Sequence, residues 1–213
     1  MKHIAKIILI FLVFSHIKTN AQFSKTIDFD TEHLKKGSIV YKNLKNKYDF
    51  ILSYSVSTGW RIGDTASFDI LARKNKTWKK ILLKCSIRNP SGIAKIEVTK
   101  FEKQKAEQLI AQLSRLGFWS LNNDSLNIKE IKPKIPSENF VKKDTVVIVT
   151  DRIRRYSIVD GSSYRFEIIK KNAVNVYHCE SPESYLRVFP EIKSTVVFIK
   201  AKDAFEKAIK INQ

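Results

Sequence analysis

Residues with reactive side chains gather in one short window of this chain, DGSSYRFEIIKKNAVNVYHCESPESY, which covers 160–185. His178 and Cys179 are neighbours in it, and Glu167 lies between them and Asp160. A thiol activated by an imidazole is a hydrolytic nucleophile, and carboxylates held in different environments do general acid–base chemistry. Both reactions need the side chains to meet within hydrogen-bond reach. The elements that carry these residues therefore decide whether they form a site.

The alternation of side chains in this window predicts a β-hairpin. With 170–172 as a three-residue loop, Ile169 faces Ala173 and the pairing runs back to Tyr164 opposite His178. The predicted apolar face carries Tyr164, Phe166, Ile168, Val174, Val176 and His178. Neighbours on one strand point to opposite faces, so His178 and Cys179 do not form a Cys–His pair. We expect no catalytic site here, with a ligand contact of His178 at the strand end as the alternative.

Strand patterns fill most of the chain before residue 100, and a helix follows them. Thr99 and Glu102 have the spacing of a capping box, and Gly117 is placed to end the helix. A turn at 74–76 joins two of the strands. The predicted strands before this helix are 37–42, 48–56, 67–73, 77–88 and 93–100.

Further strands and two helices are predicted after residue 144. The strands are 145–150, 154–159, 164–170 and 173–179, with an Asp160-Gly161 turn between the second and third. Helices begin at Pro182 and near Ser194. The sequence thus predicts an α+β fold, built as an antiparallel meander sheet or sheets with helices packed on one face.

The first residues have the order of a signal peptide. Lysines precede an apolar run at 7–14, and small residues lead to a cleavage site after Ala21. The run is too short to span a bilayer, and no later segment is apolar enough for a membrane span. We expect 1–21 to be removed and the mature protein to be periplasmic or secreted.

The mature chain divides by composition. We expect a β-rich lobe with a terminal helix at 22–120, a polar loop at 121–143, and a β-meander with helices at 144–213. One continuous domain over 22–213 is the alternative. We expect this protein to be a monomer.

The chain is strongly basic, with 39 Lys and Arg against 21 Asp and Glu and a net charge of +18. The leader carries three lysines and no acid, so the mature chain keeps a net charge of +15. This charge is compatible with an anionic partner, but we favour a lysine-rich solvated surface as its explanation. Lysine, unlike arginine, does not grip phosphate with a planar fork.

Metal sites and cofactors are not expected. Only His33 and His178 remain after cleavage, and no phosphate-binding loop, paired CxxC or nucleophile elbow is present.

Alternation in KILLKCSIRN places Cys85 among core residues. A disulfide to Cys179 is the alternative, because an exported chain permits one.

The window at 160–185 resembles a pattern in uncharacterised exported proteins and lipoproteins of Bacteroidetes-type bacteria. The shared features are a DG turn, two strands with aromatic residues around a basic turn, and Ser-Pro opening a helix. The resemblance reaches from Phe101 to the end, and departs at Tyr164 and Cys179, where tryptophan and arginine are expected. It implies an α+β fold and export, and it implies no activity.

Three functions are compatible with these observations. We favour a non-enzymatic binding module of the cell envelope, whose partner is an anionic envelope polymer or another exported protein. Hairpin tips often carry binding residues, and a tryptophan among lysines either stacks on a base or sugar or packs on the sheet. The candidate binding residues are Lys74, Lys76, Trp78, Lys170, Lys171 and His178. The alternatives are a hydrolase using Asp64, Asp69 or Glu167, and an inhibitor or immunity-type partner of another exported protein.

Overall fold

A computed structural model of the chain describes most of the sequence after residue 36. The described residues are 37–58, 65–86, 93–126, 130–131, 154–155, 161–171 and 173–209. Within them, no helix has the length and apolar character that crossing a membrane requires.

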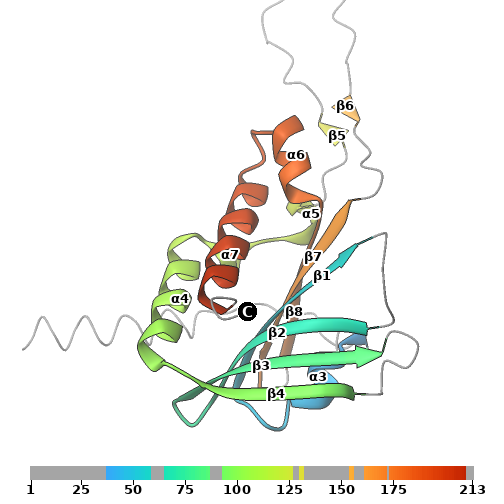
Figure 1. Ribbon diagram of the computed structural model, residues 1–213. Helices are drawn as coiled ribbons and strands as arrows, with labels where there is room; N and C mark the ends of the chain where they lie inside the picture. The colour runs from blue at the N-terminus through green and yellow to red at the C-terminus, as the bar shows by residue number, and fades with distance from the viewer. Residues whose placement is uncertain are drawn as a thin grey trace, which may run out of the picture.

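Six antiparallel strands form one sheet in the order β4-β3-β2-β1-β7-β8 (Figure 1). Their bounds are β1 Phe50–Thr58, β2 Thr65–Lys74, β3 Thr77–Ser86, β4 Ile93–Phe101, β7 Ser162–Lys170 and β8 Ala173–Glu180. The central pairing joins β1 to β7, residues far apart in sequence, from Phe50 opposite Lys170 to Thr58 opposite Ser162. The segments before and after residue 121 therefore share one sheet.

Helices cover both faces of this sheet, most of them on one side. Figure 1 shows α4 and α7 over one face, which we call the helix face. The helices there are α4 Lys103–Arg115, the 3₁₀ turn η1 Phe118–Ser120, α5 Asn123–Leu126, α6 Pro182–Val188 and α7 Lys193–Ile209. The short helix α3, Ile39–Leu44, packs on the opposite face, which we call the α3 face. A separate two-residue pair joins β5 Glu130–Ile131 to β6 Arg154–Arg155. The predicted α+β class with an antiparallel sheet is confirmed.

The core of the helix face centres on aromatic rings. The Phe166 ring on β7 lies 5.1 Å from Phe118 and 5.6 Å from both Phe198 and Phe205, centroid to centroid. Tyr54 on β1 is 4.9 Å from the same ring. Edge-on and tilted contacts at these distances add to the stabilisation that burial gives. Phe166 thus ties η1 and α7 to the middle of the sheet.

The register of the β7–β8 hairpin differs from the prediction by one residue. Lys170 pairs with Ala173 across a two-residue turn, so Tyr164 faces Cys179 and Arg165 faces His178. His178 therefore lies on the α3 face, and Cys179 lies on the helix face. The prediction assumed one apolar face, but each face of these strands packs on its own core. With both faces buried, alternation does not select the register.

Two other local predictions were wrong. Residues 39–44 form α3 where a strand at 37–42 was expected, because Ser38 accepts a hydrogen bond from the Tyr41 amide at 2.9 Å and begins a helix. The expected three-residue turn at 74–76 has two residues, Asn75 and Lys76, with φ of 47° and 66°. Such positive angles are typical of a type I′ hairpin turn, whose twist matches the strands.

The end of α4 was predicted correctly, and its beginning was not. Gly117 takes a φ of 78° just after the helix. Thr99, however, belongs to β4, and Glu102 makes no side-chain cap bond at the helix start. Glu102 pairs instead with Lys105 at 3.1 Å.

The strand expected at 145–150, the Asp160 turn residue and most of 154–159 lie outside the described residues.

Candidate functional site: a basic surface at one end of the sheet

Two lysine-bearing hairpin turns lie on either side of the start of β1. The Asp49 amide donates to the Arg73 carbonyl at 2.8 Å, and the Asp49 carboxylate accepts from the Asn75 amide at 2.9 Å. On the other side, the Lys171 amide lies 3.4 Å from the Asp49 carbonyl oxygen. Adjacent strands are about 4.8 Å apart, so β1 separates the two turns by about 10 Å. The sheet topology thus brings together four of the six candidate residues, Lys74, Lys76, Lys170 and Lys171.

More basic residues join these turns. The segment that links α3 to β1 adds Lys45 and Lys47, and β2 adds Arg73 next to its turn. We call this set the basic surface, and its members are Lys45, Lys47, Arg73, Lys74, Lys76, Lys170 and Lys171. In the described segments 45–50, 73–77 and 170–171, Asp49 is the only acidic residue. The surface therefore carries a large excess of positive charge.

Trp78 is buried and packs beneath the basic surface. Its side chain is 3% exposed, and its ring lies edge-on to Phe50 at 6.0 Å. The Arg73 guanidinium lies over the same ring at 5.5 Å. A buried ring leaves no open face for a base or sugar, so the ligand-stacking role considered for Trp78 does not fit. Its contact with Arg73 positions a cation of the basic surface.

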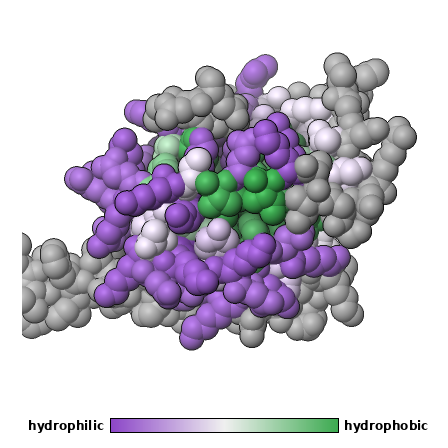
Figure 2. Space-filling view, turned by 60° about the horizontal axis from the view of Figure 1, so that its bottom comes forward, coloured by the Kyte–Doolittle hydropathy of each residue, from purple (hydrophilic) through white to green (hydrophobic). Residues whose placement is uncertain are grey.

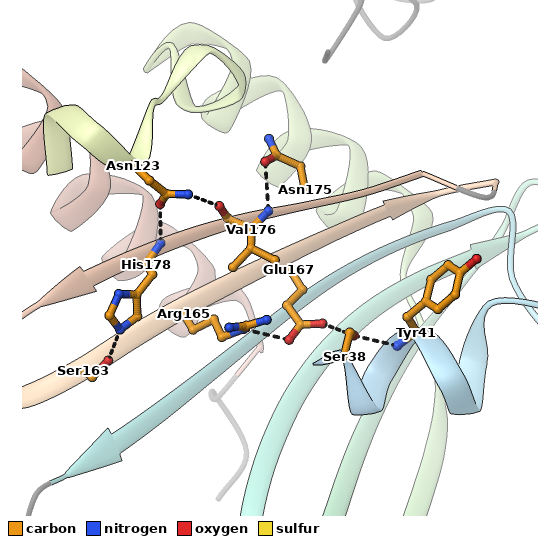
Figure 3. A network of polar contacts seen from close by, with 9 residues as sticks. All are labelled: Ser38, Tyr41, Asn123, Ser163, Arg165, Glu167, Asn175, Val176 and His178. Atoms are coloured by element: carbon orange, nitrogen blue, oxygen red, sulfur yellow. Dashed lines mark hydrogen bonds and ion pairs between the residues drawn. The ribbon is translucent and has the colours of Figure 1, made fainter. Parts of the chain in front are cut away.

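His178 lies away from the basic surface, near the far end of β8 (Figure 3). It lies five residue steps along the strand from Ala173, a distance of about 17 Å. Its Nε2 is hydrogen-bonded to Ser163 Oγ, and its amide donates to Asn123 Oδ1 at 2.9 Å. Burial lowers the pKa of His178. This half-buried histidine is held by its neighbours and does not belong to the lysine cluster.

Glu167 is part of a buried structural network (Figure 3). It is 3% exposed and accepts hydrogen bonds from Ser38 Oγ and, at 2.8 Å, from Arg165 Nε. Asp69 pairs with Tyr54 on the helix face, whereas Glu167 pairs with Ser53 on the α3 face. Opposite faces keep these two carboxylates apart, and Asp64 lies outside the described residues. Asp69 and Glu167 therefore do not form an acid–base pair with each other.

A cavity of about 720 Å³ lies between β2–β4 and the helices α4 and α7. Leu82 is in its lining, flanked across the strands by Asp69 and Glu97. Lys80 also lines it and donates to the Ile209 carbonyl, while Glu97 forms an ion pair with Lys95. The volume suits a small molecule, and the lining carries four lysines, Lys80, Lys100, Lys105 and Lys207, against the two carboxylates of Asp69 and Glu97.

The two cysteines are buried thiols on different faces. Cys85 on β3 packs in the α3-face core, and Cys179 on β8 packs in the helix-face core. Three strands lie between β3 and β8, too far for a disulfide. Burial raises the pKa of both, that of Cys179 to about 12, which keeps them protonated and unreactive. In the described part of the chain, no three His, Cys, Asp or Glu residues gather as a metal site.

Three members of the basic surface were not predicted. Lys45 and Lys47 precede β1, and Arg73 lies near the end of β2. Their charge was visible in the sequence, but their place beside Lys171 depends on the β1–β7 pairing. Arg154 and Arg155 do not belong to the basic surface, because Figure 1 shows β6, which carries them, far from the β2–β3 turn. In comparisons with known proteins, no family model, curated protein or solved structure matches this chain.

Proposed function

We propose that this protein is an exported, non-enzymatic binding module whose basic surface holds an anionic polymer of the cell envelope or its surroundings. The observation that carries the proposal is the meeting of lysines from three separate segments around Asp49. Lysines spread by composition alone have no reason to gather at one end of a sheet. Hairpin tips held by a rigid sheet are also typical positions for binding residues.

The chemistry of this surface favours a polyanion over a small anion. Its lysines lie on turns or at strand ends and act as point charges, and Arg73 is held against Trp78. Such contacts do not need a closed pocket lined by backbone amides, as a site for a small anion does. Binding of a polyanion then comes from the release of counterions, and the affinity falls steeply as the salt concentration rises. On duplex DNA, the plot of log affinity against log salt has a slope near −0.9 per phosphate contact.

A double variant with one lysine removed from each turn tests this proposal. Lys74→Gln with Lys171→Gln should weaken binding to fluorescent heparin roughly tenfold at low salt, and should flatten the plot of log affinity against log salt. Lys193→Gln with Lys200→Gln removes the same charge from α7, where both lysines are exposed, and should change affinity less than about twofold. Equal losses in the two variants would show that only the net charge matters and would overturn the proposal.

Export is the second part of the proposal and is supported by the charged, apolar and small-residue order of 1–21. When the full chain is expressed with its leader, the protein recovered outside the cytoplasm should begin at or near Gln22. Intact-mass measurement reads this directly. A soluble product that retains Met1 would contradict it.

A further inference from the structure

The two edges of the sheet differ in how their backbone groups are satisfied. On β8, the Asn123 side chain donates to the Val176 carbonyl at 2.7 Å and accepts from the His178 amide at 2.9 Å (Figure 3). The Val176 amide is bonded to Asn175 Oδ1 at 2.8 Å. Side-chain amides thus take the place of a further strand. Such covering blocks the addition of another chain at this edge.

The other edge, β4, is open in the described part of the structure. β4 extends over nine residues and pairs with β3 on its inner side. Among the described residues, no hydrogen bond is made to the outer backbone groups of β4. Unpaired amides and carbonyls in an extended row are a template for another strand.

Apolar side chains lie next to this open edge on the α3 face. Val98 is 47% exposed, and Ile96, two residues away on the same face, is half-buried. Their partners on β3, Ile81 and Leu83, are buried core residues. On the side of the molecule drawn in Figure 2, an apolar patch lies among hydrophilic residues. An added strand would extend the α3-face core over Val98.

The charges beside the edge indicate what kind of strand it accepts. Lysine faces lysine in two directly opposed pairs between β3 and β4, Lys79 with Lys100 and Lys84 with Lys95, and Glu97 already offsets part of the second pair through its ion pair with Lys95. Like charges at opposed positions destabilise a sheet, and a carboxylate beside them relieves the repulsion. A second copy of the chain would bring the same lysines and a net positive charge. An acidic segment is therefore the better occupant.

We propose that β4 is a docking edge, which takes an extended acidic segment of another protein as a seventh strand of the sheet. Residues opposite Ile96 and Val98 are apolar, and those opposite Lys95 and Lys100 are acidic. Read from the residue opposite Lys100 to the residue opposite Lys95, the added strand has the order acidic, any, apolar, any, apolar, acidic. Main-chain hydrogen bonds supply affinity, and these four positions supply specificity. The edge is separate from the basic surface, so either proposal can fail alone.

Hydrogen exchange on the full chain tests the docking edge with a synthetic peptide, TETVTVET, which has this order. Saturating peptide should slow exchange of β4 amides at least tenfold, and the basic peptide TKTVTVKT should not. Val98→Lys should weaken binding of TETVTVET at least tenfold. Val56→Lys is the matched control, because Val56 is a similarly exposed valine, at 41%, on β1, and it should bind normally. The Lys74→Gln, Lys171→Gln variant should also bind this peptide normally.

Other occupants of the edge give different results. If β4 amides are already protected in the free monomeric chain, another part of the same chain covers the edge and the proposal is wrong. If light scattering shows a dimer that Val98→Lys converts to a monomer, the edge joins two copies, and the acidic-partner proposal is also wrong. Equal binding of the acidic and basic peptides, or equal effects of the two valine variants, would overturn it as well.

Discussion

At the scale of single residues, the reactive side chains of the 160–185 window have unrelated structural roles. His178 bonds to Ser163 on the α3 face, while Cys179 is buried on the helix face with its Sγ 3.5 Å from the Leu126 carbonyl. Glu167 is an anchor for α3. Neighbours in sequence were correctly expected on opposite faces, because a strand alternates. Which residue lies on which face was wrong by one position.

The lowered pKa of His178 makes stability depend on pH. Burial disfavours the charged imidazole, so the unfolded chain, with an ordinary pKa near 6.5, binds this proton more readily than the folded chain. The free energy of unfolding should therefore fall as pH drops below about 6.5. In His178→Gln this dependence should be weaker. Urea unfolding of both proteins at pH 7 and pH 5 measures it, and identical pH slopes would contradict the assignment.

At the scale of elements, α3 is a six-residue helix that is too short to be stable alone. It is held by the burial of Val40, Tyr41 and Leu44 against the α3 face and by the Ser38–Glu167 contact. Ser38 thus links the first turn of the helix to β7. This link also explains why a polar carboxylate is tolerated in the middle of a buried strand.

Removing the Ser38 hydroxyl should destabilise the protein. Ser38→Ala loses a helix cap, at about 1 kcal/mol, and a donor to a buried carboxylate, at about 1–3 kcal/mol. We expect a total loss of roughly 2–4 kcal/mol by urea unfolding, with Ser38→Thr near wild type. Ser53→Ala is the control, because the Ser53 hydroxyl is buried opposite Glu167 without a hydrogen-bond partner in the described structure. If both alanine variants lose the same stability, the hydroxyl contact is not what holds α3.

At the scale of the whole molecule, β1 is the strand that joins the early and late parts of the chain. It pairs with β2 on one side and β7 on the other, and Phe50, Leu52 and Tyr54 enter the helix-face core. Neither part of the sheet can be removed without exposing this core. A shared sheet and core favour one cooperative transition.

The two buried cysteines report on this cooperativity. Cys85 lies on β3 and Cys179 on β8, and both should resist thiol labelling in the native protein and become reactive at the same denaturant concentration. Non-reducing mass spectrometry should find two free thiols. Cys85→Ala should lower the free energy of unfolding by about 1–3 kcal/mol through lost packing. Labelling of one thiol well before the other would mean that the two parts unfold separately.

The sequence by itself determined the class of the fold and the local elements with clear signals. Strand patterns predicted β2, β3, β7 and β8, and Gly117 predicted the end of α4. The hairpin tips were also recognised as lysine-rich. These features depend on residues close in sequence, whose spacing reflects the geometry of one helix or one strand pair.

Only the tertiary structure decided how these elements meet. The register of β7–β8 was open because both faces are buried, and α3 formed where a strand was expected because Glu167, far away in sequence, binds its first turn. The basic surface required β1 to lie between β2 and β7, which no local pattern encodes. Pairing between distant strands is chosen by the whole core, since each strand fits several neighbours until the other contacts are made.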